Sequence, residues 1–431
     1  MWRRIDALAV GCNVLRINGV LPALLLGLIE QHQYSQPRTG SAISMIELSF
    51  GSLGLANTNL IIIVVLLGAL LVSLRKTQHT DLLPVSVSQE LKGLAILGIV
   101  LAHISYMLVT DNHYLFPLSM AAGVGVDIFL FMSGFGLTLG LLKKYMSPLE
   151  FYRRRLIKVF IPLWVMLLLL FAADALLLQH YYSPLYVLRS LLGWFPTANG
   201  YIDVNSPYWY ISWLLMFYLL LPLLFNAKRP WLTAIALAVI ANLVAIINPL
   251  DLQVDWLHRL HTNAFSFGMI VAWAINEPKG GSNKLATRLK LFRANAAPWL
   301  RYPLLLAMLV VAGYFAANNA DSSWPKLSPA LQAAGFEANY FIGQATSLLA
   351  MTALLIFFSL KRVEFRFLYL FGVYSFETYL MHWPLMSRYD VFFHHVPAWL
   401  APLLWLSAFI ALGWLLEKVT TPLGRWVDQH L

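Results

Sequence analysis

The chain has little charge and almost no cysteine. Only 12% of its 431 residues are Asp, Glu, Lys or Arg, whereas soluble globular domains carry about 25%. The single cysteine, Cys12, excludes an intrachain disulfide framework. Hydrophobic residues make up 59% of the sequence, and long apolar runs inside a bilayer satisfy their backbone hydrogen bonds as helices. The composition therefore excludes an ordinary soluble domain and predicts an all-α, polytopic integral membrane protein.

Acidic residues are fewer than basic ones, and the formal net charge is +10. A basic excess can indicate nucleic-acid binding, but here the Lys and Arg residues fall in short loops between apolar runs. Cytoplasmic loops of membrane proteins carry such an excess. We therefore interpret the charge as a membrane-topology signal and expect no nucleic-acid partner. No internal repeat, low-complexity tract or soluble domain is visible.

About twelve apolar segments have the length and composition of membrane-spanning helices. They lie near residues 8–29, 59–74, 92–110, 120–141, 157–177, 208–225, 231–248, 259–275, 299–317, 339–360, 366–385 and 398–416. Arg16 and Pro22 interrupt the first, so a helix that lies on the membrane surface is an alternative for it. We expect residues 1–88 to form an N-terminal extension of about two helices, followed by a membrane domain over residues 89–431.

Threading these spans alternately, with the N-terminus inside, places most Lys and Arg residues on one side of the membrane. The exceptions are Arg16, within a span, and, on the other side, Arg38, Arg189, Arg259, Lys326 and Arg388. The positive-inside rule then places both termini in the cytoplasm. On that side, residues 284–293 combine apolar and basic positions at helical spacing, which predicts a helix lying on the inner leaflet.

Residues 89–142 contain two apolar spans joined by a polar turn, which predicts a helical hairpin. His103 in the first helix and Asp127 in the second lie at the same predicted depth, roughly 10 Å from the turn. A charge inside a membrane costs about 2.5 kcal/mol or more, so both residues are candidate functional groups. Two structural interpretations stay open: a histidine that packs against a neighbouring helix, and an aspartate that only fastens the hairpin.

Lys92 lies about three helical turns before His103, so the two side chains project from similar faces of one helix. The lysine is expected at one membrane surface and the histidine past mid-depth. A cation at the entrance and a base inside suit an anionic substrate that enters end-on.

Five short motifs follow one another from Lys92 onward. They comprise Lys92 and His103; Gly125, Val126, Asp127, Phe129, Ser133, Gly134 and Phe135; Arg153, Arg154, Arg155 and Pro162; Tyr208, Trp209, Tyr218 and Pro222; and Gly372, Ser375, Tyr379, Leu380, His382 and Pro384. In this order they resemble the motifs of acyltransferase family 3, membrane enzymes that O-acylate sugars of bacterial envelope glycans. The resemblance covers about residues 90–431 and implies a ten-helix acyltransferase core. Lys92 departs from the family's usual arginine: it keeps the charge but not the bidentate fork.

The resemblance implies transfer of an acyl group, most commonly acetyl, from acyl-coenzyme A to a sugar hydroxyl at the bacterial inner membrane. In this interpretation His103 takes the hydroxyl proton, Asp127 orients or charges it, and His382 assists binding or proton transfer. Basic side chains at the cytoplasmic surface would hold the phosphates of the donor, namely Lys92, Arg153, Arg154 and Arg155. We expect no metal and no bound cofactor.

Four further side chains are candidates with weaker signals, namely Ser133, Trp209, Tyr218 and Glu377. Ser133 could donate a hydrogen bond to the oxyanion of acyl transfer, with helix packing as the alternative. Aromatic residues near a membrane surface usually form an interfacial belt, and stacking on a sugar ring is the second interpretation for them.

Two other classes of function stay open. In a proton-coupled transporter of an anionic small molecule, the intramembrane histidine and aspartate would form a proton relay. A membrane scaffold would leave these buried groups without a reason. The acceptor glycan, the acyl group and the oligomeric state are not indicated by the sequence.

Overall fold

The computed structural model describes residues 46–77, 81–111, 113–144, 146–199, 203–249, 252–253, 255–276, 283–319 and 336–430. All of them belong to one compact unit, Ile43–Leu431. The first predicted span, residues 8–29, lies outside the described residues. The second, residues 59–74, belongs to the same compact unit as the later helices.

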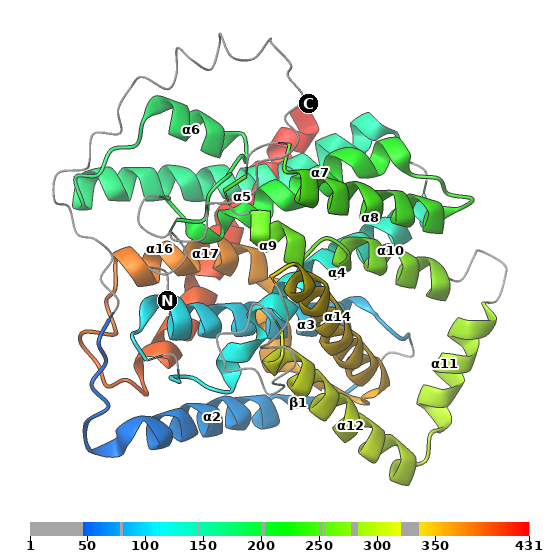
Figure 1. Ribbon diagram of the computed structural model, residues 1–431, viewed down its shortest axis with the longest axis horizontal. Helices are drawn as coiled ribbons and strands as arrows, with labels where there is room; N and C mark the ends of the chain where they lie inside the picture. Colours follow the sequence, from blue (N-terminus) through cyan, green and yellow to red (C-terminus); the bar gives the residue numbers. More distant parts are fainter. Residues whose placement is uncertain are drawn as a thin grey trace. The chain divides into compact units, whose positions relative to one another are not determined.

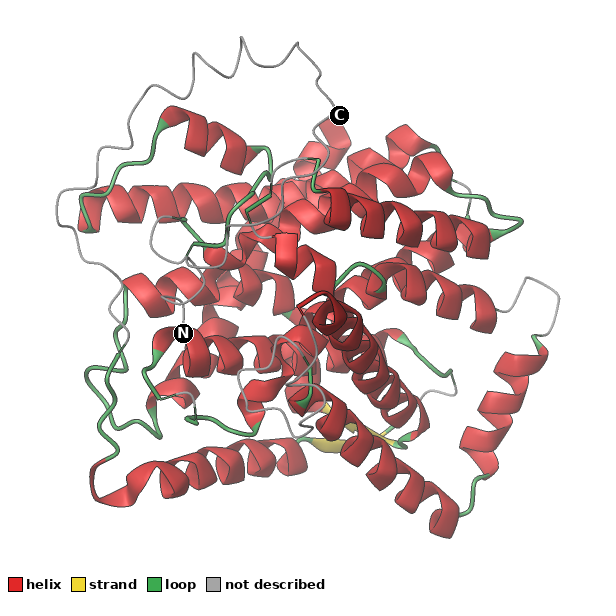
Figure 2. Cartoon of the chain, in the orientation of Figure 1, coloured by secondary structure: helices red, strands yellow, loops and turns green. Residues whose placement is uncertain are grey.

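The described chain is helical almost throughout (Figures 1 and 2). Its α-helices are α2 (Gly54–Val72), α3 (Val85–His103), α4 (Ala122–Lys143), α5 (Pro148–Leu177), α6 (Pro184–Leu191), α7 (Trp209–Leu224), α8 (Pro230–Ile247), α9 (Asp255–Leu260), α10 (Ala264–Ile275), α11 (Lys284–Asn295), α12 (Pro298–Ala317), α14 (Phe336–Leu360), α15 (Arg366–Val373), α16 (Ser375–Arg388) and α17 (Ala401–His430). Two short strands, β1 (Leu74–Lys76) and β2 (Val363–Phe365), pair antiparallel.

Nine helical segments of the described chain are long and apolar enough to cross a membrane. This agrees with the predicted all-α membrane bundle, but not with twelve continuous spans. The predicted span 259–275 is divided by the polar residues His261, Thr262 and Asn263, and only the 12-residue α10 follows them. The predicted span 366–385 is divided at Tyr374 into α15 and α16. Both breaks place polar groups inside the bundle.

The peripheral helices carry apolar side chains on their exposed faces. Only 11% of the α2 span and 22% of the α12 span is buried, and Figure 1 shows both helices along the lower edge of the view. Val72 of α2 and Trp299 of α12 are among the most exposed large apolar side chains. Such surfaces are stable against lipid tails and unfavourable in water, which supports the membrane assignment.

Helix α3 packs against α15 so closely that their backbones touch. A Cβ atom on Gly93 would lie 1.8 Å from the carbonyl oxygen of Leu368, and one on Gly372 would lie 1.8 Å from that of Gln89. Small residues allow this approach between membrane helices, where packing rather than the hydrophobic effect drives association. The contact fixes α3 beside the chain that continues into α16.

Helix α4 makes a second close contact, with α10. A Cβ atom on Gly134 would lie 2.1 Å from the carbonyl oxygen of Phe265, and one on Gly268 would lie 2.2 Å from that of Phe131. On the other side, Gly125 approaches the carbonyl oxygen of Ala95 in α3. Helix α4 is therefore held between α3 and α10.

One end of the bundle is closed by the β1–β2 ribbon and a buried ion pair. Lys361 contacts the carboxylate of Glu90 in α3, and the exposed fractions of the two side chains are 3% and 0%. The ammonium also donates to the carbonyl of Val363 and lies about 5 Å from the ring centroids of Phe358 and Phe365. Breaking such a buried pair is destabilising because it leaves an uncompensated charge. We call this the basic end; α11, with its apolar residues Leu285 and Leu289 exposed, also lies here, tied by Lys290 to Asp81.

At the opposite end, the loop between α6 and α7 is tied to the end of α16. The guanidinium of Arg388 donates to the carboxylate of Asp174, the hydroxyl of Tyr182 and the backbone carbonyl of Asp203. Burial raises the pKa of the Asp203 carboxyl above its ordinary value, although the hydroxyl of Thr197 donates to it. Hydrogen bonds thus tie the described part of this loop to the end of α16.

We predict that Gly93→Ala lowers the thermal stability of the purified protein, since the added methyl group must displace the backbone of α15. Overpacking of this kind costs about 1–3 kcal/mol. The matched control is Gly68→Ala in α2, where a Cβ atom meets nothing within 4 Å and alanine favours the helix. Thermal unfolding in detergent measures both; equal midpoints for the two variants would contradict the close contact.

Candidate functional site

Two histidines from distant parts of the sequence meet inside the bundle. His103 ends α3 and His382 lies in α16, and their Nδ1 and Nε2 atoms are 2.9 Å apart. The rings stack with centroids 5.1 Å apart and an interplanar angle of 14°. The contact between α3 and α15 accounts for this meeting, because α16 follows α15 directly.

The partners of each nitrogen determine the tautomers. Nδ1 of His382 lies 3.0 Å from the carbonyl oxygen of Tyr379 and 3.2 Å from that of Thr378. Carbonyl oxygens only accept hydrogen bonds, so this Nδ1 carries the proton and Nε2 of a neutral His382 is an acceptor. His103 must then donate from Nδ1, which leaves its Nε2 with a lone pair. The pair therefore presents one basic nitrogen, Nε2 of His103.

The two histidines differ in accessibility. His382 is fully buried, with an exposed fraction of 0%, whereas His103 is partly exposed. The rings of Tyr106 and Trp383 contact His103 edge-on, with centroids about 6 Å away. A π-helical turn, Ile104–Leu108, follows His103 directly, and such turns often occur at functional sites. His103 is thus the more exposed member of the pair.

Asp127 lies in a different cluster. Its carboxylate accepts from Nδ1 of His261 at 2.8 Å and from the hydroxyl of Ser347 in α14. All three side chains are almost fully buried. The ring of Trp209 stacks on His261, with centroids 5.9 Å apart. The structure therefore brings His103 and His382 together and gives Asp127 and Trp209 other partners.

A row of hydroxyl groups lies between α4 and α7. Ser133 of α4 lies close to the hydroxyl groups of Tyr210 and Tyr218 of α7. The ring of Tyr210 contacts that of Tyr379 with centroids 5.6 Å apart, and Tyr379 lies 6.3 Å from the ring of His382. These side chains connect Ser133 to the histidine pair by direct contacts.

The hydroxyl groups of Ser133, Tyr210 and Tyr218 lie in line with basic residues at the basic end. Arg155 of α5 interacts electrostatically with both Tyr218 and Lys92. The face of α4 that carries Ser133 also carries Gly136 and Gly140, both exposed and with nothing within 4 Å of an added Cβ atom. A smooth, open helix face thus extends from Ser133 towards the end of α4 that carries Lys143.

Two of the other predicted donor-binding residues, Arg153 and Arg154, form ion pairs of their own. Arg153 pairs with Asp428 of α17 at 3.2 Å, and Arg154 pairs with Glu150 at 2.8 Å on its own helix. Both pairs are exposed to solvent. Of the arginine triplet, Arg155 is near enough to Lys92 for their positive charges to repel.

Glu377 lies on the face of α16 that packs against α17. Gly413 of α17 approaches the Cβ atoms of Tyr374 and Glu377, at 3.0 and 3.6 Å from an added Cβ. The side chain is buried, with an exposed fraction of 9%. Glu377 therefore faces α17, while His382 of the same helix faces His103.

Sequence reasoning missed His261 and Tyr210. His261 follows another histidine, His258, and begins the polar run before α10. This interruption of an apolar pattern is the sequence signal that could have identified His261. Tyr210 lies beside Trp209 in an aromatic run, where spacing alone does not separate a site residue from an interfacial one.

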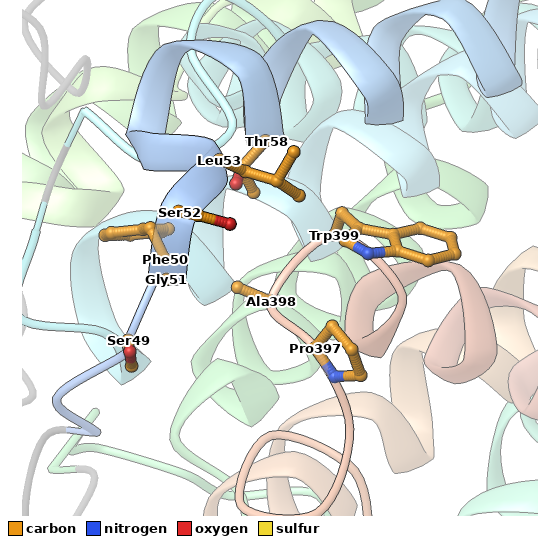
Figure 3. Close-up of a pocket in the computed structure, with 9 residues that line it drawn as sticks. All are labelled: Ser49, Phe50, Gly51, Ser52, Leu53, Thr58, Pro397, Ala398 and Trp399. Carbon is orange, nitrogen blue, oxygen red and sulfur yellow. The ribbon is translucent and has the colours of Figure 1, made fainter.

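Figure 3 shows a pocket between the start of α2 and the loop before α17, with a cavity of about 260 Å³. Residues 49–53, Thr58 and residues 397–399 line it. None of these side chains is titratable, so the pocket lacks the base that acyl transfer requires. The histidine pair remains the candidate catalytic centre.

Comparison with known proteins identifies the chain. A family model described as an acyltransferase domain matches residues 91–417. The chain belongs to acyltransferase family 3. No curated protein and no solved structure matches it. The resemblance inferred from the five motifs is thereby confirmed, and together with the apolar helices it makes the protein a multi-pass membrane acyltransferase; a transporter is not favoured.

We predict that His382→Leu lowers the acyl-transfer rate by on the order of 100-fold or more, because His103 loses the acceptor that fixes its tautomer. His382→Gln should retain part of the activity, since its side-chain oxygen can accept from Nδ1 of His103. Turnover of both variants, with membrane expression as the control, tests the role. Equal losses in the two variants would contradict a role based on this hydrogen bond.

Proposed function

We propose that the protein transfers an acyl group, most commonly acetyl, from acyl-coenzyme A to a hydroxyl of a sugar in a cell-envelope glycan or lipid-linked saccharide. The observation that carries this proposal is the hydrogen bond from His103 to His382. It leaves a single lone pair on an accessible imidazole, which is the arrangement that a general base for a hydroxyl requires.

In the proposed reaction, Nε2 of His103 takes the proton of the acceptor hydroxyl while the oxygen attacks the thioester carbonyl. The bond from Nδ1–H to His382 stabilises the imidazolium that forms, as an oriented partner does in other histidine bases. Collapse of the tetrahedral intermediate breaks the carbon–sulfur bond. The sulfur of coenzyme A receives the proton from His103, so the products are the ester and the free thiol.

The donor is proposed to enter from the basic end. Lys92 and Arg155 supply adjacent positive charges, which suit the phosphates of coenzyme A. The open face of α4 at Gly136 and Gly140 suits a slender pantetheine arm, because no side chain projects from it. The hydroxyl groups of Ser133, Tyr210 and Tyr218 then continue towards His103. One of them is a candidate donor to the tetrahedral oxyanion.

The proposed location is the bacterial inner membrane, with the basic end and both termini in the cytoplasm. The clustering of Lys and Arg residues at that end supports this orientation through the positive-inside rule. Acyl-coenzyme A would then enter from the cytoplasm, where thioester donors are made, and the acceptor sugar from the opposite end. Coenzyme A acts here as a co-substrate.

We predict that the purified protein with labelled acetyl-coenzyme A and a glycan acceptor releases free coenzyme A, and that His103→Ala lowers this release by about 100-fold or more. The matched control is His394→Ala, which removes an exposed histidine whose Nδ1 bonds to the carboxylate of Asp390. Near-normal turnover of His103→Ala would overturn its role as the base.

Lys92→Ala should raise the Michaelis constant for the donor and leave turnover nearly unchanged, because a phosphate contact is kept equally in the ground and transition states. Lys92→Arg, which keeps the charge, should behave like the parent protein. Lys284→Ala removes an exposed lysine at the start of α11 and serves as the control. A fall in turnover with unchanged donor affinity would instead place Lys92 in the catalytic step.

A further inference from the structure

Pro384 interrupts the hydrogen bonds of the helix that carries His382. In an α-helix the carbonyl of residue 380 accepts from the N–H of residue 384, and proline has no N–H. Pro384 lies inside α16, and Leu380 is fully buried. A buried carbonyl without a donor is costly where no water can reach it. The structure must therefore supply another donor to Leu380.

Two side chains from the segment before α7 supply that donor. The side-chain amide nitrogen of Asn205 lies 2.9 Å from the carbonyl oxygen of Leu380, and the hydroxyl of Tyr208 lies 2.8 Å from it. Both side chains are almost completely buried, with exposed fractions of 1% and 0%. The carbonyl also fixes the orientation of the amide, since only its nitrogen can donate.

The same segment is tied to α16 at two further points. The hydroxyl of Tyr379 donates to the carbonyl of Pro207 at 2.7 Å, and Arg388 donates to the carbonyl of Asp203. Residues 203–208 therefore lie alongside α16, from Arg388 at its end to the turn that contains Leu380. Several independent bonds fix the position of this segment relative to the helix.

The turn that these side chains complete is the one that orients His382. The carbonyls of Thr378 and Tyr379, which receive the Nδ1 proton of His382, flank Leu380 on one side, and His382 lies two residues beyond it. If this turn shifts, the 2.9 Å contact to His103 shifts with it. The tautomers of both rings depend on that geometry.

We propose that Tyr208 and Asn205 are positioning residues that replace the hydrogen bond lost at Pro384 and so hold His382 against His103. The hydrogen bonds do not depend on the reaction, but the expected effect on rate rests on the proposed function. Neither residue needs to touch a substrate to act in this way.

The first test compares two tyrosine variants. Tyr208→Phe removes one donor to Leu380, and Tyr114→Phe removes an equally buried hydroxyl that donates to the carbonyl of Ala398. Loss of one buried hydrogen bond corresponds to about a tenfold change in an equilibrium. We expect Tyr208→Phe to lower turnover about tenfold with the donor Michaelis constant unchanged, and Tyr114→Phe to lower only the thermal midpoint.

The second test restores the missing backbone donor. Pro384→Ala provides an N–H at the position from which a regular helix would bond Leu380. In this background Tyr208→Phe should lower both the turnover and the thermal midpoint by less than it does in the parent protein. If Tyr208→Phe does not fold, Asn205→Leu removes the other donor and leaves the tyrosine in place.

The outcomes separate this proposal from the proposed function. If the parent protein releases coenzyme A and Tyr208→Phe behaves like Tyr114→Phe, the positioning role is wrong and the function stands. If the parent protein cleaves no acyl-coenzyme A, the proposed function is wrong. The thermal midpoints of Tyr208→Phe, measured with and without Pro384→Ala, then still test whether Tyr208 replaces the missing helix hydrogen bond. If Tyr208→Phe lowers the thermal midpoint equally in the parent protein and in the Pro384→Ala variant, Tyr208 does not replace the helix hydrogen bond lost at Pro384.

Discussion

The backbone contact between α3 and α15 is the constraint on which the candidate site depends. Gly93 and Gly372 let the two helices approach until a single methyl group at either position would collide with the opposite backbone. This approach places the end of α3 beside α16 and leaves the rings of His103 and His382 in stacked contact. A bulkier residue at either glycine would therefore separate the two histidines.

Desolvation explains why so many polar groups in this bundle have specific partners. A carbonyl, a carboxylate or an imidazole that is buried in a membrane bundle requires a hydrogen-bond partner from the protein itself. Lys361 pairs with the carboxylate of Glu90. His261 and Ser347 donate to the carboxylate of Asp127, and Asn205 and Tyr208 donate to the carbonyl of Leu380. The histidine pair follows the same rule, and its protonation pattern is a consequence of its partners. The lone pair on Nε2 of His103 thus follows from the hydrogen bonds that the buried pair requires.

The sequence predicted the helices better than their partners. Apolar length located the long helices of the described chain but not the short α6 and α9. The spacing from Lys92 to His103, with the motif around His382, made both histidines of the pair candidates. Periodicity carries no information on contacts between distant segments, so the pairing of Asp127 with His261, 134 residues away, was missed. It also overlooked the break at Tyr374, where α15 ends and α16 begins within one apolar run. Only tertiary packing determines which of several buried polar residues meet.

The histidine pair joins residues 279 positions apart, and this separation has a consequence for biosynthesis. Chains are made at about 5–20 residues per second, so α3 waits on the order of tens of seconds in the membrane before α16 is made. During that interval the imidazole at its end has no fixed tautomer. In the proposed mechanism the chain therefore lacks its oriented base until the last helices insert, and activity begins only when synthesis is nearly complete.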